Sequence, residues 1–135
     1  MSIEEKQNFP TYQDSDSIEY PQNEREVSSL IKKFYKSNIP IELVGSGSKK
    51  GIGKPLQCSK TLNLTKLNGI IEYLPEELYI KVKACTSIQQ IEEELKKNKQ
   101  QLAFEPIDFG YLFNGKSNYG TAAGQVACNI SGSRR

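Results

Sequence analysis

The chain has 135 residues, enough for a single domain. Its 18 basic and 16 acidic side chains nearly cancel, which excludes a protein that holds nucleic acid by charge alone. Histidine is absent, so histidine-based triads and histidine-rich metal sites are excluded within this chain. The apolar stretches are too short for a transmembrane helix, and no apolar signal sequence follows the first residue. We therefore expect a soluble, cytoplasmic, single-domain protein that binds no nucleic acid.

The three cysteines, Cys58, Cys85 and Cys128, show no C-x-x-C spacing and cannot all pair with one another. This pattern favours a reducing compartment over a zinc site or a disulfide framework. No cationic pattern surrounds Cys85 or Cys128, so we interpret both as small buried residues rather than redox groups.

Charge divides the chain into two parts. Residues 1–22 carry five acidic side chains and one lysine, whereas the rest carries 17 basic and 11 acidic side chains. We predict a flexible acidic tail over residues 1–16 and a folded, mildly cationic domain over residues 17–135. A positive net charge suits an anionic ligand.

The predicted elements before the C-terminal third are a helix, four short strands and a second helix. A helix is expected to begin at the capping residue Asn23 and to end near Asn38, because apolar side chains recur between them at helical spacing. A second helix is expected after Thr86 or Ser87 for the same reason, with Ile88, Ile91 and Leu95 on one face. Strands are predicted at Ile41–Val44, Thr61–Leu64, Ile70–Leu74 and Tyr79–Ala84.

The C-terminal third has a different composition. Pro106 to Tyr119 is predicted as a loop rich in glycine, asparagine and aromatic residues, in which Tyr111 and Phe113 are expected to anchor the loop. Gly120 to Gly132 is predicted as a helix of small residues. The chain stops soon afterwards without a closing element, so we expect it to be the N-terminal part of a longer domain.

A glycine-rich segment, Gly45 to Gly53, follows the first predicted strand, Ile41–Val44. Its glycines would let the backbone approach a phosphate, with Ser46, Ser48 and either Lys49 or Lys50 adding donors. It matches neither a Walker A loop nor a dinucleotide-binding fingerprint, because the required glycines and the following helix are missing. Spacing alone leaves open whether this is a phosphate loop or a plain connection.

The small-residue segment from Gly120 also has two interpretations. Small side chains at the start of a helix can leave backbone N–H groups uncovered, which makes a site for an anion. The same residues also suit a close contact between a helix and its neighbour. The spacing does not decide between the two.

Taken in order, these segments resemble the FAD-binding domain of the vanillyl-alcohol oxidase/PCMH type, and within it the FAD-binding subunits of bacterial glycolate oxidases. The resemblance covers roughly residues 19–135. It rests on Pro21 with the helix after it and on Val44–Lys49, Gly53–Pro55, Pro75–Leu78 and Ala84–Ile88. Its most specific pieces are Leu102–Pro106 and Val126–Arg135. Ala123 and Cys85 depart from it, because the family usually has glycine at both positions. Cys85 would then strain its turn, and Ala123 would crowd the cofactor.

The resemblance implies an α+β fold, namely the first lobe of such a domain, with a small mixed sheet and flanking helices. It implies that FAD is held non-covalently, because relatives that attach FAD covalently do so through histidine. The implied cofactor contacts are backbone contacts to the diphosphate from Gly45, Ser46, Gly47, Ser48 and Lys49 on one side. On the other side are Thr121, Ala122, Ala123 and Gly124, with Pro106 approaching the flavin.

The resemblance also implies a function in oxidation of a small 2-hydroxy acid. In relatives this subunit works beside a second flavoprotein subunit and an iron–sulfur subunit, which could hold it peripherally at the inner membrane. No catalytic residue is assigned. Two alternatives stay open: a scaffold or assembly subunit that has lost flavin, and a flavin-dependent reductase of the kind that acts on UDP-sugar enolpyruvates.

Overall fold

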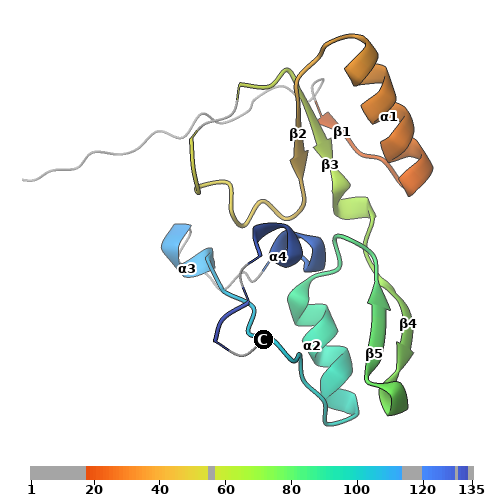
Figure 1. Ribbon diagram of the computed structural model, residues 1–135, viewed down its shortest axis with the longest axis vertical. Helices are drawn as coiled ribbons and strands as arrows, with labels where there is room; N and C mark the ends of the chain where they lie inside the picture. Colours follow the sequence, from red (N-terminus) through yellow and green to blue (C-terminus); the bar gives the residue numbers. More distant parts are fainter. Residues whose placement is uncertain (1–17, 55–56, 114–119, 130, 134–135) are drawn as a thin grey trace, which may run out of the picture.

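The computed structural model describes residues 18–54, 57–113, 120–129 and 131–133. The predicted tail, residues 1–16, lies outside these residues. Figure 1 shows two layers, each made of a small sheet and a helix, with the short helix α4 (Ala122–Cys128) between them. This is an α+β arrangement, as predicted.

The sheet of the first layer has three parallel strands. Its strands are β1 (Ile18–Glu19), β2 (Ile41–Val44) and β3 (Lys60–Asn63), in the order β1-β3-β2. The central strand is the best covered, and Leu62 on it is fully buried. Strand β2 is at the edge of the sheet. The chain leaves the sheet at Val44 and passes directly into the glycine-rich segment.

Helix α1 (Glu24–Lys36) joins β1 to β2 and lies against the parallel sheet. Its start is capped in both directions. The Asn23 side chain accepts a hydrogen bond from the Glu26 N–H at 3.0 Å, and the Glu26 carboxylate accepts from the Gln22 N–H at 2.7 Å. Phe34 is the buried residue of the helix. The predicted start is therefore confirmed. The apolar face is covered only in part, because Ile31 on it is 39% exposed.

The second layer is an antiparallel hairpin packed on α2 (Ile88–Lys97). The hairpin strands are β4 (Ile70–Leu74) and β5 (Tyr79–Val82). Ser87, rather than Thr86, caps α2, because its hydroxyl accepts from the Gln90 N–H at 3.1 Å. The buried cluster consists of Ile88, Ile91 and Leu95, with Tyr73, Ile80, Val82, Leu102 and Ala122 packed against it. Burial of such side chains is the main stabilising term of the layer.

Several predicted boundaries differ from the structure. In the described part of the chain, the strands form two sheets of opposite kind instead of one mixed sheet. The strand predicted at Thr61–Leu64 ends at Asn63, because the Asn63 side chain caps a 3₁₀ turn at Leu64–Lys66. The strand predicted at Tyr79–Ala84 ends at Val82.

The C-terminal third also departs from its prediction. A one-turn helix, α3 (Gly110–Phe113), lies where only loop was predicted, and α4 is shorter than Gly120–Gly132. The exposed fraction of Tyr111 is 68%, so its predicted anchoring role is wrong, while the Phe113 side chain lies outside the described residues. Within the described segments, no helix combines the length and apolar character needed to cross a membrane.

Candidate functional site

The segment after β2 presents open backbone donors. No acceptor is found among the described residues for the N–H groups of Ser46, Gly47, Ser48 and Lys49. The carbonyls of Gly47 and Lys49, in contrast, accept from Lys50 and Ile52 at 3.1 and 3.0 Å. Gly47 has φ +74°, and a change in the sign of φ within a turn directs successive N–H groups to one side. Such a concave row of donors can bind an anion.

Side chains from this segment converge on Gly120. A Cβ atom on Gly120 would lie 2.6 Å from the Ser48 Oγ, 3.2 Å from the Lys49 Nζ and 3.6 Å from the Ser46 Oγ. Gly120 also has φ +79°, which favours glycine. The structure therefore brings the two glycine-containing motifs of the sequence together, with two hydroxyls and an ammonium group at their junction.

The two adjacent lysines have different surroundings. Lys50 forms an ion pair with Glu42, at 3.1 Å between Nζ and Oε2. The Lys49 Nζ lies 5.8 Å from the centre of the Phe109 ring and has no carboxylate partner in the described part of the chain. Lys49 is therefore the better placed of the two lysines to meet an anion at this junction.

The start of α4 differs from the expectation of uncovered N–H groups. The Ala122 N–H donates to the Thr86 carbonyl and the Ala123 N–H to the Ala84 carbonyl, both at 2.9 Å. The Gly124 N–H donates to the Thr121 Oγ1 at 3.2 Å. These bonds favour the close-contact interpretation, because they use the backbone donors that an anion would need.

Small residues make this close contact possible. A Cβ atom on Gly45 would lie 3.3 Å from the Thr121 Oγ1 and 3.5 Å from the Cys85 Sγ. A Cβ atom on Gly124 would lie 3.0 Å from the same Thr121 oxygen. Thr121 is buried and caps the start of α4. Its side chain therefore contacts both the glycine-rich segment, at Gly45, and α4, at Gly124.

The structure accommodates Cys85, which is one of the two departures from the family pattern. Cys85 has no positive φ, so the predicted strain in its turn is wrong. Its thiol is buried behind Gly45, and burial raises the pKa of Cys85 above that of an exposed thiol. Cys128 is exposed, which contradicts its interpretation as a buried residue. Ala123 is exposed as well, and its crowding of a cofactor stays a prediction.

The segment around Pro106 is fastened to α4. The Gln125 Nε2 donates to the Ile107 carbonyl at 3.0 Å, and Gln125 is only 2% exposed. Gln125 is not among the residues predicted from the sequence, although a lone amide in a run of small residues signals a buried hydrogen-bonding role. Pro106 itself is half-buried.

The chain is similar to known proteins in sequence and in fold. Residues 16–135 match the family described as the FAD binding domain. The glycolate oxidase subunit GlcE of Escherichia coli (strain K12) is 34% identical over 105 residues, covering 78% of this chain and 28% of that protein. The chain thus spans less than a third of the length of this curated relative.

Solved structures of similar fold include two of alkyldihydroxyacetonephosphate synthase. One, described as in P212121, has a TM-score of 0.62 at 21% identity and covers 82% of this chain and 20% of the enzyme chain. The other, described as in P1, has a TM-score of 0.55 at 20% identity and covers 77% and 19%. At these identities the likeness concerns the fold. Because the family model matches most of its length, the chain belongs to the FAD-binding domain family, with FAD as its cofactor.

Proposed function

We propose that this chain is the N-terminal part of the FAD-binding subunit of a glycolate oxidase-type 2-hydroxy acid dehydrogenase, and that Gly45–Lys49 binds the FAD diphosphate. The observation that carries the proposal is the junction at Gly120, where two serine hydroxyls and Lys49 meet beside open backbone donors. The 34% identity to the glycolate oxidase subunit supports the reaction class.

The chemistry of the junction fits a diphosphate. Phosphate oxygens accept hydrogen bonds from backbone N–H groups and hydroxyls, and an ammonium group offsets their charge. Ser46, Gly47, Ser48 and Lys49 would supply these donors. Thr121–Gly124 would act mainly as the wall behind the diphosphate, because the N–H groups of Ala122, Ala123 and Gly124 already have acceptors within the chain.

The flavin would supply the redox chemistry when bound, accepting two electrons from the 2-hydroxy acid. The residues of this chain bind and orient the cofactor, and none is assigned a catalytic role. With no histidine in the sequence, we propose non-covalent attachment of FAD. A second flavoprotein subunit and an iron–sulfur subunit are the proposed partners, in the cytoplasm or peripherally at the inner membrane.

Titration of the purified chain with FAD tests this proposal. Flavin fluorescence would report binding, and circular dichroism would report folding. We expect saturable binding that ADP, which carries the same diphosphate, reverses by competition. A chain that melts cooperatively yet binds neither ligand would contradict the proposal.

One observation favours a second candidate, a scaffold subunit without flavin. The N–H groups at the start of α4 are engaged within the chain, so one side of the predicted diphosphate site lacks free backbone donors. The cooperative but non-binding outcome of the titration would support this scaffold role. FAD-dependent oxidation of a nicotinamide donor would instead support the reductase.

A further inference from the structure

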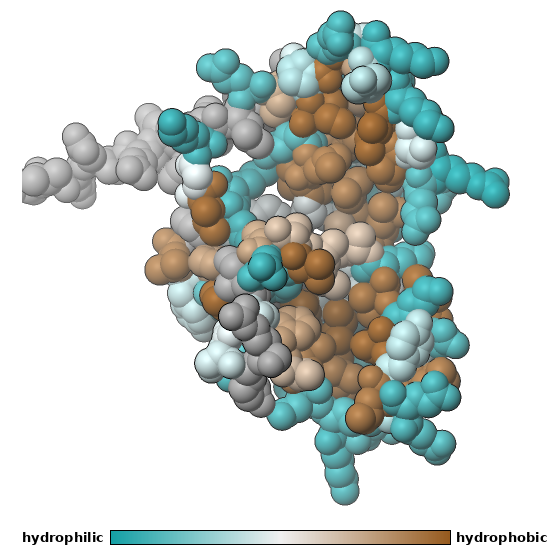
Figure 2. All heavy atoms as spheres, viewed as in Figure 1, coloured by the Kyte–Doolittle hydropathy of each residue, from teal (hydrophilic) through white to brown (hydrophobic). Residues whose placement is uncertain are grey.

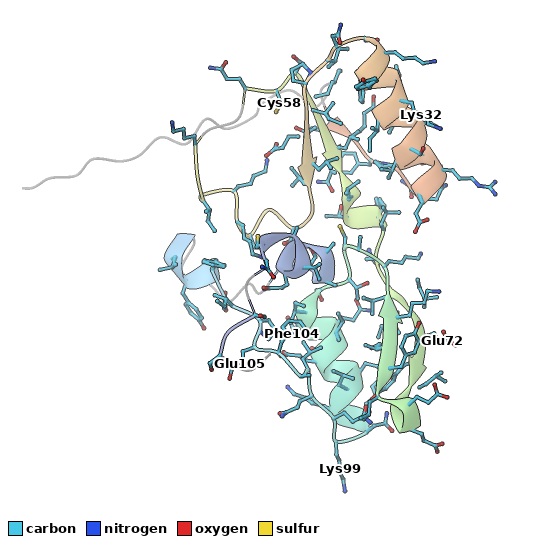
Figure 3. All side chains as sticks on the ribbon, viewed as in Figure 1. Lys32, Cys58, Glu72, Lys99, Phe104 and Glu105 are labelled. Carbon is cyan, nitrogen blue, oxygen red and sulfur yellow. The ribbon has the colours of Figure 1, made fainter. Side chains whose placement is uncertain are left out.

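The segment from Glu105 to Gly110 is held at several points, one of which is next to Lys49 of the candidate site. At its far end, Phe109 lies beneath the Lys49 ammonium group, and in its middle the Ile107 carbonyl accepts from Gln125. At its near end, Glu105 binds the segment Ser131–Ser133. Figure 3 places Glu105 on the connection that leads from α2 towards α3.

The contact at Glu105 is made by both backbone and side chain. The Glu105 N–H donates to the Ser131 carbonyl at 3.1 Å. The Glu105 Oε2 accepts from the Ser133 N–H at 3.2 Å and from the Ser133 hydroxyl at 3.0 Å. Hydrogen bonds to a charged acceptor are stronger than those between neutral groups, so this carboxylate is the strongest side-chain part of the contact.

Gly132 lets the two segments approach this closely. It has φ +67°, and a Cβ atom there would lie 2.6 Å from the Glu105 Cβ and 2.7 Å from the Glu105 Oε2. A larger residue at this position would push Glu105 away. The two segments are thus matched to each other, although 25 residues lie between Glu105 and Ser131.

We propose that Glu105 is a positioning residue for the cofactor site, a role that rests on the proposed function. Its carboxylate, bound to Ser133, fixes the start of the Pro106–Phe109 segment. That segment in turn places the Phe109 ring beneath Lys49, whose ammonium group faces the junction at Gly120. Loss of the carboxylate therefore changes the surroundings of bound FAD without removing any group that binds its diphosphate.

The test compares Glu105→Ala and Glu105→Gln in the full chain, with Glu94→Gln as the control. Glu94 is on α2 and pairs with Lys97, so its substitution removes a carboxylate that has no contact with this segment. We expect Glu105→Ala to weaken FAD binding by at most about tenfold, because the charged hydrogen bond that it removes orders the segment and does not contact FAD. Glu105→Gln should weaken it less, because its amide oxygen can still accept from the Ser133 N–H.

The visible circular dichroism of saturated FAD separates positioning from general stability. A purely structural role would lower the melting temperature but leave the spectrum of the bound flavin unchanged. We expect an altered spectrum for Glu105→Ala and an unaltered one for Glu94→Gln. If Glu105→Ala is not folded, Glu105→Gln carries the test, with a smaller change in the same direction.

The outcomes distinguish the two proposals. If the wild-type chain binds FAD and the Glu105 variants match it in affinity and spectrum, the positioning role is overturned while the proposed function stands. If the folded wild-type chain binds no FAD, the proposed function fails and the positioning role fails with it.

Discussion

Two segments of this molecule are rich in small residues and glycine, but their backbone N–H groups differ in whether they have acceptors within the chain. In Ser46–Lys49 the N–H groups lack acceptors among the described residues, whereas at the start of α4 they are bonded to Thr86, Ala84 and Thr121. In the first segment, small residues leave donors open for a ligand. In the second they allow a helix to approach its neighbour closely enough to use those donors.

The two sides of the junction at Gly120 have different roles. The glycine-rich segment supplies binding groups, and α4 supports it from behind through Thr121 and Gly45. Figure 2 shows apolar residues gathered over both layers on the face in view. Substitutions on the two sides should therefore differ in their effect on FAD affinity and on stability.

The largest effect is expected for Gly47→Asp. A carboxylate among the donors of Ser46–Lys49 would repel the diphosphate, and like charges placed together cost several kcal/mol, or about a hundredfold or more in affinity. A positive φ also disfavours a side chain at this position. Isothermal titration calorimetry with FAD would measure the loss.

Gly53→Asp is the matched control for Gly47→Asp. Gly53 has a positive φ of +89° and open space around its Cβ position, so the two substitutions share backbone strain and charge. Only Gly47 lies within the row of donors. Equal loss of affinity in the two variants would mean that strain, and not the row of donors, explains the effect.

A smaller effect, on both affinity and stability, is expected for Gly120→Ala. The new Cβ would lie 2.6 Å from the Ser48 Oγ. The alanine would also have to keep a positive φ, which costs about 1–2 kcal/mol before any displacement of the serine. FAD affinity should fall by roughly tenfold because Ser48 and Lys49 must move. Thermal unfolding and FAD titration would measure the two losses.

Gly124→Ala is the corresponding change on the supporting side. Its φ is not positive, and alanine favours a helix over glycine by about 1 kcal/mol, which offsets the 3.0 Å contact with Thr121. We therefore expect little change in FAD affinity. A loss as large as that of Gly120→Ala would show that α4 binds the cofactor directly.

Substitutions of Lys49 and Lys50 distinguish the effect of a charge at the site from the effect of a charge next to it. Lys49→Gln removes the ammonium group beside Gly120 and should weaken FAD binding by about tenfold, with a shallower dependence on salt. Lys50→Gln breaks the partly exposed pair with Glu42, and a pair of this kind is worth under about 1 kcal/mol of stability. If Lys50→Gln weakened binding more than Lys49→Gln, the assignment of the two lysines would be reversed.

The sequence predicts the local elements well because their signals are local. The cap at Asn23 and the apolar spacing of Ile88, Ile91 and Leu95 each depend on residues within one or two turns. The glycine-rich segment was also located correctly, because a strand that ends in glycines is visible in a single stretch. These patterns place the elements without any knowledge of their neighbours.

What the sequence could not predict depends on contacts between distant segments. The N–H groups of α4 are occupied because Ala84 and Thr86 lie beside them, which no spacing within Gly120–Gly132 reveals. The same holds for Lys49 against Lys50, since only the fold brings Glu42 to one of them. The division of the strands into two sheets follows from pairing, which the strand patterns do not encode.

The smallest effect concerns the thiols and tests the packing behind the junction. Cys85 is buried behind Gly45, and burial raises its pKa, so the fraction of reactive thiolate near neutral pH is low. Cys128 is exposed. We expect iodoacetamide to modify Cys128 at least about tenfold faster than Cys85 in the folded chain, as followed by peptide mass spectrometry.

Denaturant should remove this difference, because unfolding returns the Cys85 pKa to its ordinary value. The same shift predicts that stability declines as the pH rises past that ordinary value, since the unfolded chain then loses the proton more readily than the folded one. Cys85→Ser should flatten this alkaline decline, whereas Cys128→Ser should leave it unchanged. Rapid modification of Cys85 in the folded chain would mean that the contact between Gly45, Thr121 and Cys85 opens readily, so that the two sides of the junction are not held together as described.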